Sequence, residues 1–320
     1  MRRVTLGETG IETSCLGFGC ASLGSRVGAE EGLRALAAAH ERGVDWLDLA
    51  PAYGRGEAEV IAARFLKGRR DRVRICTKVG LAPPKAGGGL AGALMPLARR
   101  AVGAVPGLRA ALRRTGVQSN VKLPLTPELI RGSLEASLRR LGTDHVDLYA
   151  LHNAEAAEIG RDEVLRALEA VLASGKARAV AVAGDAAVAG AVVARGAPFG
   201  AVQLAAPAPG EAAAGVLEAA RAAGLGAVLH SVLGVEGALG RFEARVGRDP
   251  GARAEVLAAT GLAEPRAALA RLLLERAFAL NPEGVVLVSM FSERARVANL
   301  ALAEGPPDPE AALLVERLAG

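Results

Sequence analysis

Segments of strand length alternate with helical segments eight times along this chain, and this alternation limits the fold more than any other feature. The strand-like apolar runs are Cys15–Gly19, Trp46–Asp48, Val73–Thr77, Asp147–Leu151, Ala179–Val182, Ala201–Leu204, Gly226–His230 and Gly284–Val288. The helical patterns are Ala29–Arg42, Glu57–Lys67, Pro127–Leu141, Arg161–Ala173, Ala186–Ala194, Gly210–Ala223, Glu264–Ala279 and Glu293–Ala303. Eight such units favour a closed parallel barrel over an open sheet. The alternation therefore predicts an α/β fold, a (β/α)8 TIM barrel, as one domain over residues 1–320.

Two segments depart from the repeating unit. Before the first unit, Val4–Leu6 and Ile11–Thr13 flank a glycine-bounded turn, which predicts an N-terminal β-hairpin. After the third strand, residues 81–121 form a long inserted loop that contains a glycine triplet and an interrupted helical pattern. A loop of this length in a compact domain is usually functional or disordered. We interpret this loop as a lid beside the active site or as a solvated insertion. A membrane-surface helix is a third alternative.

Charge and composition limit the partners and the compartment. The formal charge is +5, but residues 81–121 carry six basic and no acidic residues, so the remainder of the chain has a charge of −1. This distribution argues against a nucleic-acid-binding surface. The chain has neither a run of eighteen apolar residues nor an apolar signal core, so we expect a cytoplasmic protein without membrane insertion. The three cysteines have no metal-type spacing and indicate reduced, buried thiols and no metal site.

Four residues of complementary chemistry follow or end three of the predicted strands. Asp48 ends the second strand, Tyr53 lies five residues later, Lys78 ends the third and His152 ends the fourth. The carboxyl ends of barrel strands are where active sites form. A lysine ammonium stabilises a nearby phenolate and moves the tyrosine pKa toward the working range, so Tyr53 would act as the acid. Asp48 would orient the lysine, and His152 would donate a hydrogen bond to a carbonyl oxygen.

The order and spacing of these four residues resemble the active-site signature of the aldo-keto reductases. The resemblance extends over nearly the whole chain, through the stretches 16–24, 138–149 and 174–180. It implies a hairpin that crosses the bottom of the barrel and a nicotinamide cofactor, NADP or NAD with NADP slightly favoured. It also implies hydride transfer to or from an aldehyde, a ketone or a sugar lactol–alcohol pair, so the expected partner is a small-molecule carbonyl or sugar substrate.

The cofactor-binding half of the signature is altered. The family's glutamine on the sixth strand matches Gln203, but its serine–asparagine pair after the fifth strand is replaced by Ala183-Gly184, which leaves Asn153 or backbone amides to hold the nicotinamide amide. His230 stands where the family stacks a tyrosine on the nicotinamide ring. The other positions that the resemblance assigns to the cofactor are Ser231, Leu233, Gly234, Arg294, Arg296 and Asn299. Either of those two arginines would suit a 2′-phosphate.

Three functions fit this pattern. The first is an NAD(P)-dependent oxidoreductase in which Tyr53 is the general acid or base. The second is a non-turnover barrel that binds a nucleotide as a sensor or structural subunit, which the altered residues Ala183, Gly184 and His230 motivate. The third is lyase or isomerase chemistry with the tyrosine as base. The sequence leaves the substrate, the redox direction, the choice of NAD or NADP and the oligomeric state open.

Overall fold

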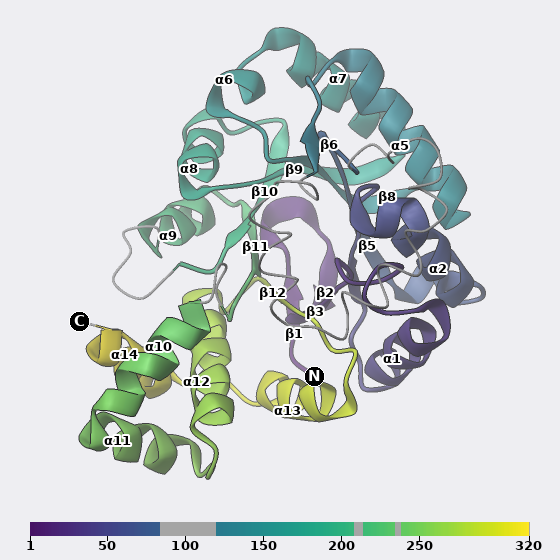
Figure 1. The fold of residues 1–320 in the computed structure, drawn as a ribbon. Helices are drawn as coiled ribbons and strands as arrows, with labels where there is room; N and C mark the ends of the chain where they lie inside the picture. Colours follow the sequence, from purple (N-terminus) through teal and green to yellow (C-terminus); the bar gives the residue numbers. More distant parts are fainter. Residues whose placement is uncertain (84–119, 208–213, 234–237, 320) are drawn as a thin grey trace, which may run out of the picture.

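The computed structural model describes residues 1–83, 120–207, 214–233 and 238–319 (Figure 1). In this part of the chain, eight parallel strands close into a barrel in the order β10-β11-β12-β3-β4-β5-β8-β9. The strands are β3 (Leu16–Gly19), β4 (Trp46–Asp48), β5 (Arg74–Val79), β8 (Val146–His152), β9 (Ala177–Gly184), β10 (Phe199–Ala205), β11 (Gly226–His230) and β12 (Val285–Val288). The prediction of a closed α/β barrel is confirmed, and each observed strand overlaps the run that predicts it.

Helices surround the barrel and follow the predicted positions closely (Figure 1). They are α1 (Ala29–Glu41), α2 (Glu57–Leu66), α5 (Pro127–Leu141), α7 (Asp162–Ala173), α8 (Ala186–Arg195), α9 (Ala214–Ala222), α12 (Pro265–Leu280) and α13 (Glu293–Glu304). The start of α5 shows why the boundaries were predictable. The Thr126 side chain accepts a hydrogen bond from the backbone N–H of Leu129, and Pro127 occupies the first turn, where its missing N–H costs nothing.

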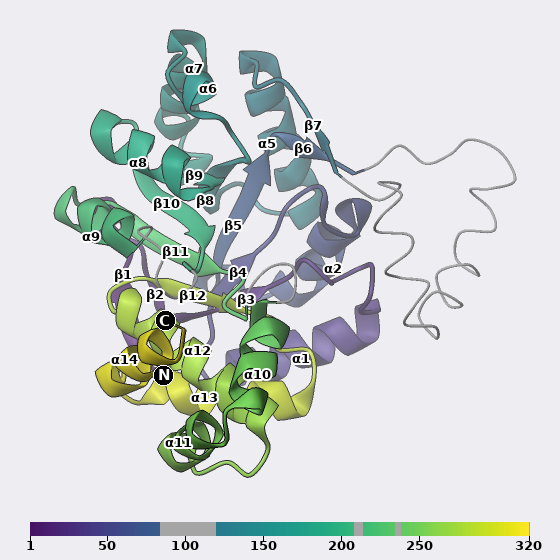
Figure 2. The same ribbon diagram turned by 60° about the vertical axis from the view of Figure 1, so that its left-hand side comes forward.

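Within the described residues, four further helices were not predicted: α6 (Ala156–Ile159), α10 (Ala238–Arg248), α11 (Pro250–Thr260) and α14 (Pro309–Ala319). Helices α10, α11 and α14 gather around α12 on one flank of the barrel (Figures 1 and 2). Signals for two of them are present in the sequence. Asp249 caps α11 through the backbone N–H of Gly251 and precedes a first-turn proline. Asp308 accepts a hydrogen bond from Glu310 N at the start of α14.

The barrel interior combines one tryptophan with several aliphatic side chains and many alanines. Trp46, the only tryptophan of the chain, is fully buried on β4. It belongs to an inner cluster to which β8, β9 and β10 contribute mainly alanines: Ala150, Ala179, Ala181, Ala183 and Ala201. Gly17 on the neighbouring strand leaves room for the indole, because a Cβ there would lie 2.8 Å from it. Small residues on the facing strands therefore make space for the tryptophan and for polar side chains above it.

The amino-terminal hairpin closes the bottom of the barrel, as predicted. Strands β1 (Arg3–Thr5) and β2 (Glu12–Ser14) pair antiparallel, with Leu6 and Ile11 fully buried between them and the barrel floor. Leu6 packs so closely on the start of β11 that a Cβ at Gly226 would lie 2.4 Å from its side chain. A glycine is therefore required at position 226 for the hairpin to pack against the barrel.

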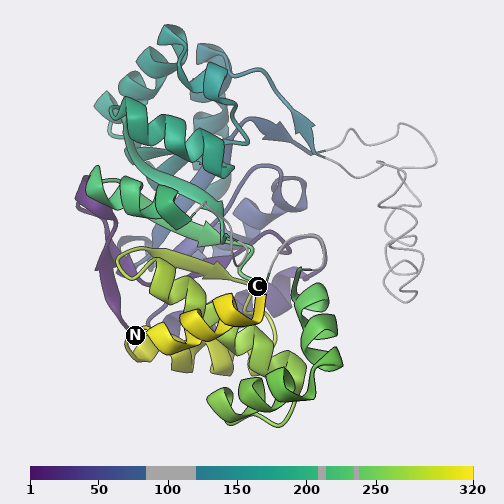
Figure 3. The same ribbon diagram turned by 90° about the vertical axis from the view of Figure 1, so that its left-hand side faces the viewer.

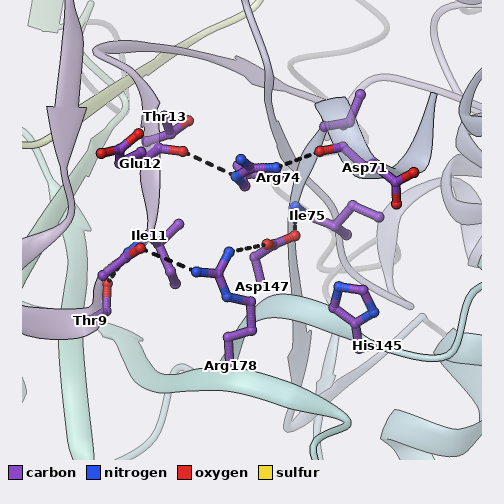
Figure 4. A network of polar contacts seen from close by, with 12 residues as sticks. Thr9, Ile11, Glu12, Thr13, Asp71, Arg74, Ile75, His145, Asp147 and Arg178 are labelled. Atoms are coloured by element: carbon purple, nitrogen blue, oxygen red, sulfur yellow. Dashed lines mark hydrogen bonds and ion pairs between the residues drawn. The ribbon is translucent and has the colours of Figure 1, made fainter.

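Asp147, at the amino end of β8, connects several elements at the bottom of the barrel (Figure 4). Its carboxylate accepts hydrogen bonds from Arg70 at 3.1 Å, from Arg178 at 3.1 Å and from the backbone N–H of Ile75 at 2.9 Å. The other terminal nitrogen of Arg178 donates to the carbonyl oxygen of Gly10 in the hairpin turn, at 3.1 Å. One buried carboxylate thus links two strands, a loop and the hairpin.

The two described flanks of the inserted loop lie at the opposite end of the barrel from the hairpin (Figure 3). Residues 84–119 lie outside the described residues, so the lid interpretation stays a prediction. The described flanks, β6 (Leu81–Ala82) and β7 (Val121–Lys122), pair antiparallel, and Lys122 forms ion pairs with Glu155 at 2.6 Å and Glu158 at 2.7 Å. The insertion therefore starts from a fixed stem that continues β5. No helix in the described ranges is both long enough and apolar enough to cross a membrane.

Candidate active site

The fold brings the four predicted catalytic residues to one pocket at the carboxyl ends of the strands. Asp48 is the last residue of β4, Lys78 lies one residue before the end of β5, and His152 ends β8. Tyr53 follows β4 in a short 3₁₀ turn, Tyr53–Gly56. All four side chains line the same cavity. Their positions at three neighbouring strand ends follow from the barrel order, because β4 pairs with β5 and β5 with β8.

The turn after Tyr53 depends on its glycines. Gly54, Arg55 and Gly56 have φ values of 57°, 60° and 91°, in the left-handed region where glycine is favoured. A Cβ at Gly54 would lie 2.5 Å from the carbonyl oxygen of Leu23. The Tyr-Gly-Arg-Gly sequence therefore lets the chain reverse tightly and keeps the phenol over the ends of β4 and β5.

Lys78 is the centre of the polar cluster. Its side chain is 1% exposed, and its Nζ donates to Asp48 Oδ1 at 2.7 Å and to the carbonyl oxygen of Leu49 at 2.9 Å. The third contact is with the Tyr53 hydroxyl, at 3.4 Å. Burial lowers the pKa of Lys78, but the Asp48 carboxylate and the tyrosine raise it more, so the net shift is upward. The lysine therefore remains an ammonium in the pocket.

The pKa of Tyr53 differs from the sequence-based expectation. Burial raises it to about 12, and the opposing effect of the Lys78 ammonium, although present, is smaller. The expectation of a net shift toward neutral pH is therefore wrong for the cavity as it stands, because desolvation outweighs the charge. The phenol consequently holds its proton at neutral pH, as a general acid must before it donates.

His152 is held neutral beside the phenol. Its ring packs edge-to-face on Tyr53, with centroids 6.1 Å apart and an interplanar angle of 89°. Burial and the Lys78 charge lower its pKa to about 3. A neutral imidazole carries one N–H, which fits the predicted role of a hydrogen-bond donor to a carbonyl oxygen.

A cavity of about 990 Å³ extends from these four residues to the space between α12 and α13. Seven of the nine residues that the sequence assigns to cofactor binding line it: Asn153, Gln203, His230, Ser231, Leu233, Arg294 and Asn299. Arg296 does not line the cavity, and its guanidinium donates to the carbonyl oxygen of Met290 at 3.3 Å. Gly234 lies outside the described residues.

Two of these residues stand in strained backbone at the strand ends. Asn153 has a φ of 53°, and its N–H donates to the carbonyl oxygen of Ala183 at 2.6 Å, next to the position where the family pair is missing. Ser231 has a φ of 54°, and its Oγ lies 2.9 Å from His230 Nδ1. Burial lowers the pKa of His230, with a further lowering by Lys78 against an opposing effect of Asp48. Strain of this kind is common at functional sites.

Three charged residues that line the outer end of the cavity were missed from the sequence: Glu264, which precedes α12, and Arg266 and Arg271 of that helix. Glu264 caps the helix by accepting from the backbone N–H of Arg266 at 2.9 Å. The sequence shows this signal, an acidic residue before a first-turn proline, but not the helix face that meets the cavity. Arg271 donates from Nε to Glu275 at 3.0 Å and from Nη1 to the carbonyl oxygen of Thr260 at 3.2 Å.

Comparison with known proteins agrees with this geometry. The sequence model of the aldo/keto reductase family matches residues 15–297. The 6-dehydroglucose reductase of Agrobacterium fabrum is 33% identical over 147 residues, 44% of this chain and 39% of that protein. The NADH-specific methylglyoxal reductase of Escherichia coli is 28% identical over 159 residues, 48% and 42% of the two chains. Aldo-keto reductase AKR11C1 from Bacillus halodurans (holo form) has a TM-score of 0.72 at 21% identity, covering 99% of this chain and 96% of its own.

These likenesses differ in what they establish. The matched stretches cover less than half of each curated relative, so those proteins' activities are not transferred by the match itself. The structural likeness establishes the barrel. The family match, in contrast, spans most of the chain and includes Asp48, Tyr53, Lys78 and His152. The chain therefore belongs to the aldo/keto reductase family.

Proposed function

We propose that this chain catalyses the NAD(P)-dependent interconversion of a carbonyl compound and its alcohol, with Tyr53 as the general acid and base. One observation carries the proposal: a buried ammonium, paired with Asp48 at 2.7 Å, lies 3.4 Å from a phenol that shares its pocket with a neutral imidazole. Structural ion pairs do not need a cavity-facing hydroxyl. A catalytic acid does, because its proton must reach the substrate.

The cavity fits a nicotinamide dinucleotide. Its volume of about 990 Å³ is at the large end of ligand pockets, and it is lined by apolar side chains along most of its length. Arginines line its outer end, where a phosphate would find cationic partners. Residues near β9, β10 and β11 would hold the nicotinamide end, and the first turn of α13 with the arginines would hold the phosphate end.

In the reducing direction, a nicotinamide cofactor bound in this cavity would supply the hydride that the carbonyl carbon needs. His152 donates a hydrogen bond to the carbonyl oxygen and thereby stabilises the negative charge that develops there. Tyr53 then gives its proton to that oxygen, and the Lys78 ammonium, held by Asp48, stabilises the resulting phenolate. Solvent reprotonates the tyrosine before the next turnover. The oxidising direction uses the same groups in reverse order.

The substrates that we propose are small aldehydes, ketones or sugar-derived carbonyls. The names of the matched relatives, a 6-dehydroglucose reductase and a methylglyoxal reductase, support this class. The pocket supports it too, since the groups that converge on the reacting position can bind an oxygen that gains negative charge. We therefore choose a panel of short aldehydes, ketoaldehydes and keto sugars for the assay.

The chain contains a matched control for the catalytic tyrosine. It has two tyrosines, and the second, Tyr149, is fully buried with its hydroxyl donating to the carbonyl oxygen of Ile130 at 2.8 Å. Tyr53→Phe should lower kcat by about 10²–10⁴-fold while nucleotide affinity, measured by calorimetry, stays unchanged. Tyr149→Phe should lower the melting temperature and leave kcat of the folded protein near wild type.

The alternatives have distinct outcomes in the same experiment. Nucleotide binding without turnover on any substrate of the panel would identify the non-turnover nucleotide-binding barrel that Ala183, Gly184 and His230 also fit. A wild-type kcat in Tyr53→Phe would refute the assignment of the acid. Substrate conversion that needs no nucleotide would favour the lyase or isomerase alternative.

For the cofactor, we propose a preference for NADP that rests on Arg294. Its side chain is 83% exposed at the outer end of the cavity, and its nearest ion-pair partner, Glu264, is 3.9 Å away, so the guanidinium is available to a phosphate. Arg296 is the matched control on the same helix, because its guanidinium is turned to Met290. Arg294→Ala should weaken NADP binding about tenfold and leave NAD binding unchanged. An equal loss in Arg296→Ala, or no loss in either variant, would contradict this assignment.

A further inference from the structure

Glu59 is a fully buried carboxylate that the proposed mechanism does not use. It lies in the first turn of α2, the helix that continues directly from the Tyr53 turn. Its Oε2 accepts a hydrogen bond from Arg140 Nε at 2.6 Å, and its Oε1 accepts one from Thr77 Oγ1 at 2.7 Å. Both oxygens of the buried charge therefore have donors, which offsets the cost of removing it from water.

Thr77 connects this carboxylate to the strand that carries the catalytic lysine. It is fully buried on β5 and directly precedes Lys78. Successive side chains of a strand point to opposite faces of the sheet. Lys78 lines the catalytic cavity, so Thr77 lies on the outer face of the strand, where it meets α2. The Thr77–Glu59 bond thus joins the first turn of α2 to β5 at the position next to the lysine.

Arg140 completes the network from α5. Besides its bond to Glu59, its Nη2 donates to Ser137 Oγ on the same helix at 3.2 Å. Its aliphatic stem also covers the end of the Tyr53 turn, because a Cβ at Gly56 would lie 3.6 Å from Arg140 Cδ. The arginine therefore contacts the turn directly and also holds the carboxylate that anchors the following helix.

On the basis of the proposed function, we propose that Glu59 is a positioning residue that fixes the Tyr53 turn relative to Lys78. The two catalytic groups stand on different elements, the phenol on the turn and the ammonium on β5, and their contact of 3.4 Å depends on how these elements are joined. Glu59 joins them through Thr77. A shift of the turn away from β5 would weaken the charge interaction that stabilises the phenolate, and it would slow the proton transfer.

Substitutions at Thr77 test this role. Thr77→Val removes the hydroxyl donor, keeps a residue that suits a strand, and leaves the Glu59–Arg140 pair in place. We expect kcat to fall about three- to tenfold, while the Kd of NADPH, measured by calorimetry, stays within about twofold of wild type. Thr77→Ser keeps the hydroxyl and should restore the wild-type kcat. Ser137→Ala is the matched control, because it removes the other bond of Arg140 and leaves the link to β5 intact.

A readout independent of turnover follows the phenol itself. Both tyrosines of the chain can be replaced by 3-fluorotyrosine, whose fluorine lowers the pH of ionisation, and fluorine NMR then gives one resonance for each. Tyr149→Phe removes one resonance and thereby assigns the other to Tyr53. Thr77→Val should raise the midpoint of the Tyr53 titration by about 0.5–1 pH unit, the effect of a retreat of about 1 Å from Lys78. The Thr77→Ser and Ser137→Ala proteins should keep the wild-type midpoint.

The outcomes separate positioning from a purely structural role. An unchanged Tyr53 titration in folded Thr77→Val would overturn the proposal. An equal shift in Ser137→Ala would overturn it as well, because it would indicate a general loosening of the packing around α5. Failure of the proposed function would look different: wild type and variants alike would turn over no substrate, while the fluorine titration would still report whether the Thr77–Glu59 link holds the phenol beside the lysine.

Discussion

The two ends of the barrel both bury aspartates against cations, but they use them differently. At the bottom, Asp147 accepts from two arginines and one backbone N–H, all between 2.9 and 3.1 Å. At the top, Asp48 concentrates two donors on one oxygen, and its lysine partner keeps a third, longer contact of 3.4 Å with Tyr53. The bottom network is closed by protein groups, whereas the top network ends at a hydroxyl that faces a cavity.

This difference indicates how a buried aspartate paired with a cation contributes to stability at one end of the barrel and to chemistry at the other. In barrels of this type, the carboxyl ends of the strands carry function and the amino ends carry stability. Arg178 extends the Asp147 network to Gly10 of the hairpin, so that the bottom charges hold a structural element in place (Figure 4). Lys78 instead holds a phenol in the pocket.

The largest effect is expected at Asp147. Asp147→Asn keeps an acceptor for the Ile75 N–H but removes the counter-charge of Arg70 and Arg178, whose side chains are 17% and 39% exposed. Breaking a buried ion pair typically costs 3–5 kcal/mol, and partial hydration of both arginines reduces this here to about 2–3 kcal/mol. The melting temperature should fall by about 5 °C, while kcat of the folded enzyme stays at the wild-type value.

The control for this variant is Asp144→Asn. Asp144 is exposed and pairs only with its neighbour His145 in the described structure, so its removal should leave the melting temperature unchanged. A normal melting temperature in Asp147→Asn, or a loss of kcat in the fully folded variant, would show that the two ends are not divided in function.

The second effect concerns pH and belongs to the top of the barrel. The folded-state pKa of His152 is about 3, below the ordinary value near 6.5 that the unfolded chain has. Between pH 6.5 and 3 the unfolded chain therefore binds a proton that the folded histidine refuses, and stability falls as pH falls through this window. From pH 7 to pH 5 the contribution of one such group is about 2 kcal/mol.

The measurement compares the acid sensitivity of wild type and His152→Asn. Unfolding in urea at pH 7 and pH 5 should show a smaller loss of stability in the variant, with a residual loss from His230, whose pKa is lowered in the same direction. Identical losses in both proteins would mean that the folded-state pKa of His152 is not lowered, and that the folded histidine takes up a proton between pH 7 and pH 5.

The barrel was predictable from local signals, and the site was predictable only in part. Strand-length runs and caps such as Thr126-Pro127 indicate elements directly, because the forces that fix them act between near neighbours in sequence. The strand-end positions of Asp48 and Lys78 then follow from the barrel geometry. The net pKa of Tyr53 does not follow, since it depends on how much water the folded pocket excludes.

Long-range contacts of flexible side chains account for what was missed. The bond from Gln203 to Asp48 joins β10 to β4 across the barrel, and no spacing in the sequence encodes it. Arg294 and Arg296 are two residues apart on one helix and were equivalent in the sequence. The fold distinguishes them, because one guanidinium faces the cavity and the other is turned to Met290.

The smallest effect is expected at the other bottom aspartate. Asp45 is bonded by Arg3, by Thr13 Oγ1 at 2.7 Å and by the backbone N–H of Ser14 at 2.7 Å. Unlike the partners of Asp147, Arg3 is half exposed, so solvent screens its charge and Arg3→Ala leaves two neutral donors in place. The variant should lose about 0.5–1 kcal/mol, seen as a shift of about 1–2 °C in melting temperature.

Salt separates this effect from a loss of packing. At about 1 M salt the screening length is about 3 Å, so the difference between wild type and Arg3→Ala should nearly vanish if it is electrostatic. Arg42→Ala, which removes a similarly exposed pair with Glu304, should show an equal or smaller shift with the same salt dependence. A larger, salt-independent loss in Arg3→Ala would mean that Arg3 seats the hairpin by packing. Arg3 and Asp147 would then contribute comparably to the stability of the bottom of the barrel.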